Sequence, residues 1–195
     1  SPSGFTSKAA LWVKEAFEAL GCPARITNKG GVLAELGGTD GENALLLEAH
    51  TDTLGAMVCQ IKGNGRLKMT NLGGLSPNNA EAENVRVYTR TGKVYEGTCQ
   101  LADASVHVNG NYADTKRSFD TIEVVLDEEV KNAQDVKNLD ISVGDVVCFD
   151  PRTRRTEKGY IKSRFLDDKL SVGILLGFAK FLKDSGRTPE RKLYA

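Results

Sequence analysis

Apolar side chains recur at helical spacing near both ends of the chain. In the segment Thr6–Leu20 they fall on one face of a helix. A second, wider apolar face begins after Asp168, and Ser185-Gly186 followed by Pro189 provides the usual end of a helix. The pattern therefore predicts one helix over about 6–20 and a longer one over about 169–185.

Strand-like runs lie beside these two helices in the sequence. The runs Ala24–Thr27 and Val32–Leu36 flank Asn28–Gly31, which is the pattern of a hairpin. The run Ala44–Ala49 is almost continuously apolar, which is typical of a strand buried on both faces of a helix-covered sheet. The residues Lys192–Ala195 are expected to open another strand. Both ends of the chain are therefore predicted to be α/β.

The middle of the chain has a different pattern. Between Met57 and Asp150, short strand-like runs alternate with turn signals; among them are Val85–Tyr88, Ile122–Leu126 and Val143–Phe149. One short helix is expected near 133–138. This density of hairpins indicates a small β-barrel or sandwich. The sequence thus predicts one α/β domain with an all-β insertion, divided at 1–57, 58–155 and 156–195.

Charge and composition exclude several classes of protein. The 195 residues contain 26 Lys and Arg against 26 Asp and Glu, so the formal net charge is zero. This balance argues against a nucleic-acid-binding protein and against a surface that holds anionic membranes. No apolar run approaches the ~20 residues that span a bilayer, and the first residues lack the pattern of a signal peptide.

The four cysteines are widely separated and form no C-x-x-C pair. Their neighbours are mostly apolar, so we expect buried thiols in a reducing compartment rather than disulfides or a cysteine zinc site. Together with the neutral charge, this predicts a cytoplasmic globular protein.

Histidine is scarce, since the chain contains only His50 and His107. His50 follows the apolar run 44–49, and the carboxyl end of a strand is where open α/β sheets place ligands. Asp52 lies two residues further on, as a carboxylate that can orient a metal-binding imidazole. The alternative is a surface histidine beside a turn aspartate. His107 alternates with valines and is expected to point outward from a strand.

Asp167 and Asp168 open the long C-terminal helix. Acids at this position cap free amides and complement the helix dipole, so a purely structural role is one interpretation. The other is that one aspartate bridges metal ions while its neighbour supports the start of the helix. The local pattern does not decide between the structural role and the metal-binding role.

Five segments in order resemble a known family. They are Ser3-Gly4-Phe5, LLLEAHTDTLGAMV (45–58), Leu72-Gly73-Gly74, ISVGDVVCFDP (141–151) and SRFLDDKLSVGILL (163–176). Together they are similar to the dinuclear metallo-aminopeptidases of the tetrahedral (TET), glutamyl and deblocking type, some of which carry older labels as cellulases or endoglucanases. The resemblance implies an α/β metallopeptidase catalytic domain, with a helix-covered mixed sheet, interrupted by an inserted β-barrel-like dimerisation domain.

The resemblance also implies a chemistry and its residues. His50 would bind one metal ion, Asp167 would bridge two, and Asp52 would orient His50 and tune the site. Two divalent ions (Zn, Co or Mn) would hold the scissile carbonyl and an activated water, as in other two-metal hydrolases. The implied substrates are short peptides that lose their N-terminal residues, and the implied assembly is a homo-oligomer, from a dimer to a dodecamer.

The match covers nearly all 195 residues but only the N-terminal part of a typical family member. The family places a Glu-Glu pair, an Asp and a His after the long helix, and none of these follows Asp168 here. We therefore expect that the C-terminal part of the catalytic domain is absent and that the 195 residues alone are inactive. A non-catalytic remnant serving as an assembly or binding module is the alternative. A glucanase ranks last, because it needs two carboxylates flanking a sugar site.

Overall fold

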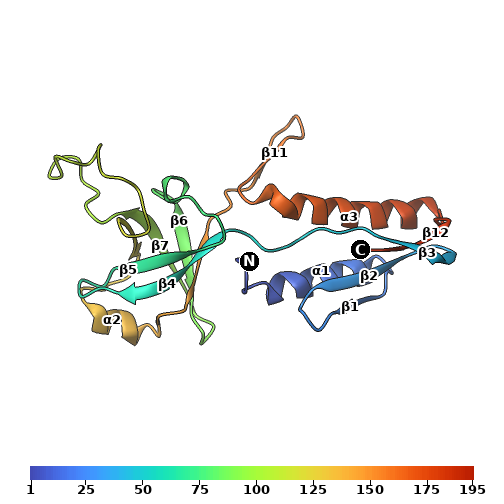
Figure 1. The fold of residues 1–195 in the computed structure, drawn as a ribbon, viewed down its shortest axis with the longest axis horizontal. Helices are drawn as coiled ribbons and strands as arrows, with labels where there is room; N and C mark the ends of the chain where they lie inside the picture. Colours follow the sequence, from blue (N-terminus) through green and yellow to red (C-terminus); the bar gives the residue numbers. More distant parts are fainter. The chain divides into compact units, whose positions relative to one another are not determined.

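The structure, a computed structural model, describes residues 1–195. The chain divides into two compact units, and Figure 1 labels most of their elements. The first unit comprises Ser1, Ser3–Thr53 and Phe165–Ala195, and the second comprises Pro2 and Leu54–Arg164. The domain limits expected from the sequence, 57/58 and 155/156, lie four and nine residues inside the second unit and stay predictions.

The first unit contains a four-stranded sheet and two long helices. Its elements are α1 (Ser7–Ala19), β1 (Ala24–Ile26), β2 (Val32–Gly37), β3 (Asp40–Leu46), α3 (Leu166–Ser185) and β12 (Arg191–Tyr194). The strand order is β1-β2-β12-β3. Since β12 runs antiparallel to β2 and parallel to β3, the sheet is mixed, as predicted. The predicted helices, the hairpin and the final strand are confirmed.

One apolar core joins the helices and strands of this unit. Phe17 of α1, Ala34 of β2, Val172 of α3 and Leu193 of β12 are among its buried residues. The apolar faces that the sequence pattern predicted for both helices therefore point toward the same cluster. The long helix ends where the sequence predicted, because Gly186 adopts a left-handed conformation with φ of +62°.

The prediction of a doubly buried strand over Ala44–Ala49 is wrong. The strand β3 covers Asp40–Leu46, and its side chains are largely exposed: 42% for Leu45 and 50% for Leu46. The physical reason is that no residue of β3 belongs to the buried apolar core, and β3 is an edge strand that pairs only with β12. An apolar run predicts a strand but does not say how many neighbours cover it.

The second unit is built around a closed β-barrel. Its elements are β4 (Gly55–Ile61), β5 (Leu67–Leu72), the 3-10 helix η1 (Pro77–Asn79), β6 (Asn84–Tyr88), β7 (Val94–Leu101), β8 (Ile122–Leu126), α2 (Ala133–Asn138), β9 (Val146–Phe149), β10 (Arg154–Arg155) and β11 (Ile161–Lys162). The barrel closes in the order β4-β5-β8-β7-β6-β9. The predicted class, an α/β fold interrupted by a β-barrel, is thus confirmed, as is the short helix near 133–138.

Alternate residues of the barrel strands fill its interior. Val58, Leu67, Val87 and Val124 are fully buried. The strands approach closely at Gly97, where an added Cβ would lie 2.5 Å from the carbonyl oxygen of Val125. Glycine therefore permits the close packing of β7 against β8.

Residues 102–121 connect β7 to β8 through turns. The predicted strand around His107 is therefore wrong, although the side chain is exposed as expected. None of the four cysteines forms a disulfide; Cys99 is buried, Cys22 and Cys148 are half-buried, and Cys59 is exposed, so the predicted burial is wrong for Cys59. No helix is both long and apolar enough to cross a membrane.

Candidate functional site

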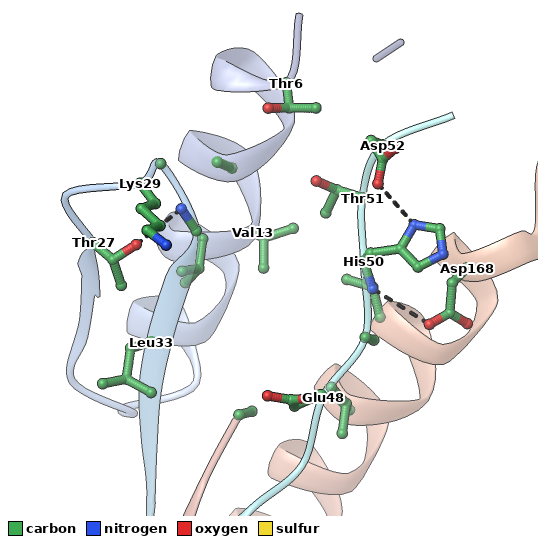
Figure 2. Close-up of a pocket in the computed structure, with 18 of the residues that line it drawn as sticks. Thr6, Val13, Thr27, Lys29, Leu33, Glu48, His50, Thr51, Asp52 and Asp168 are labelled. Atoms are coloured by element: carbon green, nitrogen blue, oxygen red, sulfur yellow. Dashed lines mark hydrogen bonds and ion pairs between the residues drawn. The ribbon is translucent and has the colours of Figure 1, made fainter. Parts of the chain in front are cut away.

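The candidate site lies where the chain leaves the edge strand β3. Residues 47–52 follow β3, and His50 projects from this segment beside the start of α3 (Figure 2). Asp52 lies two positions further on, which in extended chain places both side chains on the same side. All residues of the site belong to the first unit.

The imidazole of His50 is held between two carboxylates. Its Nδ1 lies 3.0 Å from Oδ1 of Asp52, and its Nε2 lies 3.1 Å from Oδ1 of Asp167. The ring is half exposed, and 94% of the Asp167 side chain is exposed. The exposed side of the pair is therefore accessible to a ligand or ion.

Ser3 fixes the carboxylate of Asp52 from the far side. Its hydroxyl donates a 2.6 Å hydrogen bond to Oδ2 of Asp52. This hydrogen bond lowers the pKa of Asp52; burial opposes the shift, and the neighbouring His50 adds to it. Desolvation lowers the pKa of His50, but the attraction of Asp52 and Asp167 outweighs it, so the net pKa is raised. The two groups therefore stabilise each other's charged forms.

Asp168 holds the segment of His50 against the start of α3. Its Oδ2 accepts a 3.3 Å hydrogen bond from the backbone N–H of His50. Hydrogen bonds from the Ser171 side chain and backbone lower the pKa of Asp168, with a further contribution from His50. A cis peptide bond joins Asp167 to Asp168. The two carboxylates have different partners, the His50 backbone N–H for Asp168 and the His50 ring for Asp167. Asp168 supports the helix start, while Asp167 faces the imidazole.

The structure brings together the three site residues named from the sequence, His50, Asp52 and Asp167. It does not test their roles. The sequence analysis missed Ser3 and Ser171, which position Asp52 and Asp168. Ser3 opens the first of the five family-like segments, but nothing in the local pattern links it to a residue 49 positions away.

The arrangement favours a cation between the His50 ring and the Asp167 carboxylate. In the neutral imidazole whose Nδ1–H donates to Asp52, the lone pair of Nε2 faces the carboxylate of Asp167. Two facing acceptors at 3.1 Å need a cation between them, either a proton on Nε2 or a metal ion. In a tetrahedral zinc site, nitrogen and oxygen ligands lie roughly 3.4 Å apart, close to the observed spacing.

A cleft of about 770 Å³ adjoins these residues. The hairpin β1–β2 forms one wall and residues 46–52 form the other, with α1 and α3 contributing apolar side chains. Figure 2 shows Lys29 and Leu33 on the hairpin side, and Glu48 and Thr51 on the opposite side.

A family model described as M42 glutamyl aminopeptidase matches residues 30–194. The chain belongs to the M42 glutamyl aminopeptidase family. The resemblance read from the sequence is thereby confirmed. YhfE of Bacillus subtilis (strain 168), which carries an aminopeptidase name, is 42% identical over 176 residues, covering 90% of this chain and 51% of the relative.

Solved structures share the fold of this M42 chain. An aminopeptidase from the archaeon Desulfurococcus kamchatkensis aligns with a TM-score of 0.85 at 23% identity, covering 100% of this chain and 51% of its own. The TET1 peptidase of Pyrococcus horikoshii, whose title describes assembly into a tetrahedron or a large octahedral shell, aligns with a TM-score of 0.74 at 20% identity, covering 94% and 52%. The chain therefore spans about half the length of these relatives.

The M42 chain supplies only part of a metal-ligand set at this site. The structure contains no group of three or more His, Cys, Asp or Glu side chains arranged to hold a metal ion. His50 and Asp167 provide one imidazole and one carboxylate, whereas zinc sites use about three or four protein ligands. The donor chemistry fits a divalent ion, and the number of donors falls short.

Proposed function

We propose that the whole protein is a metal-dependent aminopeptidase that removes N-terminal residues from short peptides. The observation that carries this proposal is the 3.1 Å approach of Nε2 of His50 to Oδ1 of Asp167, in a chain of the M42 family. Two divalent ions (Zn, Co or Mn) would complete the site. The aminopeptidase names of the relatives support the substrate class.

Each residue has a distinct part in the proposal. His50 would hold a metal ion through Nε2, and Asp167 would serve as a ligand to both ions. Asp52 holds the Nδ1 proton and thereby fixes which ring nitrogen is free for the metal. When bound, the ions would polarise the carbonyl of the scissile peptide bond and lower the pKa of a bound water toward neutral pH. Asp168 keeps the His50 segment at a fixed distance from the start of α3.

Metal binding tests the proposal directly. In calorimetric titrations with Zn²⁺, Co²⁺ or Mn²⁺, we expect the 195-residue chain to bind with low affinity and to lose binding in the variants His50→Ala and Asp167→Asn. His107→Ala is the matched control, because it removes the other histidine from an exposed turn. Equal binding by wild type, His50→Ala and Asp167→Asn would overturn the assignment of the ligands.

Peptidase activity is proposed for the whole protein and not for the 195 residues alone. The incomplete donor set supports this distinction. We expect no release of amino acids from dipeptide or tripeptide substrates by the 195-residue chain with added metal. Measured turnover by this chain would show that His50 and Asp167 suffice, with Asp52, for catalysis.

A non-catalytic assembly module is the second candidate, favoured by the closed barrel, which forms the core of a compact unit of its own. Homo-oligomer formation, from a dimer to a dodecamer, is proposed under either candidate, supported by the assemblies named for the Pyrococcus horikoshii relative. The lack of disulfides supports a reducing, cytoplasmic location. Light scattering after size exclusion separates the candidates: oligomers of a whole protein that binds no metal favour the module.

A further inference from the structure

Two asparagines of the second unit are each followed by a glycine, Asn64 by Gly65 and Asn109 by Gly110. In such a pair, the backbone nitrogen of the glycine can attack the side-chain amide carbon of the asparagine and close a succinimide ring. Glycine permits this approach because it carries no side chain and its backbone adopts a wide range of conformations. The reaction needs no partner other than water, so local geometry decides whether it occurs.

The two asparagines hold their side-chain carbonyl groups in the same way. Oδ1 of Asn64 accepts a 3.2 Å hydrogen bond from the backbone N–H of Arg66, and Oδ1 of Asn109 accepts a 3.0 Å hydrogen bond from that of Asn111. Each is an Asx turn, in which the side chain bonds to the backbone two residues on. The donated N–H also stabilises the negative charge that develops on Oδ1 during attack at the amide carbon. This feature favours the reaction at both asparagines alike.

The two glycine nitrogens differ in their hydrogen bonds. The N–H of Gly65 donates to the carbonyl of Lys62 at 3.0 Å, in a turn that a second hydrogen bond, from the N–H of Lys62 to the carbonyl of Arg66, closes at 2.9 Å. The N–H of Gly110 forms no hydrogen bond in the structure. The hydrogen bond of Gly65 holds its nitrogen toward Lys62 and retains its proton, whereas the nitrogen of Gly110 has no such constraint.

The two glycines also differ in their access to solvent. Gly65 is buried, and a Cβ added to it would lie against Val130 and Asn132. Gly110 is exposed, and a Cβ added to it would meet no atom within 4 Å. Hydroxide, which removes the proton of the attacking nitrogen, can therefore reach Gly110 in the folded chain but not Gly65. Access and hydrogen bonding both favour reaction at Asn109.

We infer that Asn109 is a site of spontaneous deamidation in the folded chain, with the nitrogen of Gly110 as nucleophile and water as co-reactant. The nitrogen gives its proton to hydroxide and attacks Cγ of Asn109. The new N–Cγ bond closes a succinimide, and the Cγ–Nδ2 bond breaks, so that ammonia leaves with a proton from water. Water then opens the ring at either carbonyl and gives aspartate or isoaspartate. The reaction involves neither His50 nor Asp167, so it is independent of the proposed metal chemistry.

Deamidation loosens the connection between β7 and β8, because Asn109 closes its turns. Nδ2 of Asn109 donates to the carbonyl of Asp103 at 2.9 Å, and the N–H of Asn109 donates to the carbonyl of Ser105 at 2.9 Å. An aspartate in this position keeps Oδ1 but replaces the Nδ2 donor by a second oxygen, which faces the carbonyl of Asp103 as another acceptor. An isoaspartate also lengthens the backbone by one carbon. Both products therefore lose the contact to Asp103.

The test compares the two asparagines within one sample. The 195-residue chain is kept at pH 8, and peptide mass spectrometry follows the replacement of NH2 by OH at Asn64 and Asn109 over time. In the folded chain we expect Asn109 to react about tenfold faster, since Asn64 must first lose the hydrogen bond of Gly65. In guanidinium chloride we expect the two rates to converge, because both pairs then carry the same reacting groups. Equal rates in the folded chain, or a preference for Asn109 that persists after unfolding, would overturn the inference.

The variant Gly110→Ala tests the nucleophile. Its methyl group has free space and the φ of Gly110 is not positive, so the fold should be unchanged, which circular dichroism checks. We expect deamidation of Asn109 to slow about tenfold, because the methyl group hinders ring closure. Asn64 serves as the internal reference, with an unchanged rate. An unaltered rate at Asn109 would exclude attack by the nitrogen of Gly110.

The variant Asn109→Asp reproduces one product and tests the structural consequence. We expect thermolysin to cleave it near the exposed Val106 and Val108 about threefold faster than the wild type, because the contact to Asp103 is lost. Asn64→Asp is the matched control, since an aspartate keeps the acceptor oxygen of that Asx turn and no contact of Nδ2 is removed. Equal cleavage of the wild type and Asn109→Asp would show that deamidation does not loosen the connection.

Discussion

Burial at Cys99 changes the chemistry of an otherwise reactive side chain. Desolvation, with smaller contributions from Glu81 and Glu83, raises the pKa of the Cys99 thiol to about 12. At pH 8 this leaves about one thiolate in ten thousand, and the thiolate is the reactive form. Cys59 is exposed on β4.

We therefore predict selective labelling by a thiol reagent at pH 8. Cys59 should react within minutes in the native chain, and Cys99 should react only after unfolding in denaturant. Mass spectrometry of peptides from native and unfolded samples measures both. Cys59→Ser is the control, since it should remove the rapid phase. Labelling of Cys99 at the rate of Cys59 in the native chain would contradict the buried position.

Glu123 is a buried carboxylate on β8 with two cationic partners. Its side chain is 2% exposed, Nη1 of Arg66 lies 2.7 Å from Oε1, and Lys62 contacts Oε2. Burial raises its pKa, but the hydrogen bonds and charges of Lys62 and Arg66 outweigh it, so the net pKa is lowered. A lowered pKa in the folded state stabilises the fold above the unfolded-state pKa of about 4.3.

The variant Glu123→Gln should lower the free energy of unfolding by about 1–3 kcal/mol at pH 7. This loss is smaller than for a fully buried ion pair, because Lys62 and Arg66 are partly exposed and are hydrated by solvent in the variant. The difference between wild type and variant should shrink as the pH falls through about 4 and below, where Glu123 becomes protonated. Urea unfolding at pH 7, 5 and 3.5 measures it. A difference that stays constant with pH would exclude the charged pair as its cause.

At the scale of elements, the long connection between β7 and β8 depends on one arginine. The guanidinium of Arg117 donates to both carboxylate oxygens of Glu81, at 2.7 and 3.2 Å, and to the backbone carbonyls of Tyr112 and Thr115. It also lies 4.8 Å from the ring centroid of Tyr112. These contacts fasten residues 102–121 to the segment after η1.

Removing the guanidinium should therefore release this connection without unfolding the barrel. For Arg117→Ala we expect thermolysin to cleave near the exposed Val106 and Val108 about 5–30-fold faster, because the charged hydrogen bonds that hold the connection are lost. The circular dichroism spectrum should be unchanged. Arg117→Lys keeps the charge but not the paired geometry, so an intermediate rate is expected. An unchanged cleavage rate in Arg117→Ala would mean that other contacts hold the connection.

The elements also show what a sequence pattern can specify. Local periodicity was enough for α1, α3, the β1–β2 hairpin and the barrel strands, because each depends on residues close in sequence. The exposure of β3 depends on what packs against its faces, and the apolar core of this unit includes no residue of β3, which the local pattern cannot show. The turns around His107 are closed by local hydrogen bonds, from the Asn109 backbone N–H to the carbonyl of Ser105 and from the Asn109 side chain to the carbonyl of Asp103, and the alternation with valines did not reveal them.

The same limit applies to the candidate site. The contact between His50 and Asp52 follows from spacing, since residues two apart share a side in extended chain. The contact between His50 and Asp167 joins residues 117 positions apart, and only the resemblance to a family suggested it. Ser3 completes the group from the N-terminal segment, with no local pattern to indicate it.

At the scale of the whole molecule, the division into two units predicts independent folding of the barrel. All six barrel strands lie between Gly55 and Phe149, and they close on one another without a strand from the first unit. Their core is likewise their own, with Val58, Leu67 and Val124 fully buried. A closed barrel leaves no open sheet edge that needs another partner.

The fragment 54–164 should therefore fold by itself, with a β-type circular dichroism spectrum and a cooperative unfolding transition of about 5–15 kcal/mol. Its ¹⁵N NMR amide positions should coincide with those of the same residues in the 195-residue chain, except near the two cut ends. The matched comparison is 54–138, which lacks β9 and cannot close the barrel between β6 and β4. Its amide proton signals should fall within the narrow range of chemical shifts that is typical of a disordered chain. If the longer fragment were equally disordered, the barrel would depend on the first unit, because closure of its strands would not be sufficient for folding.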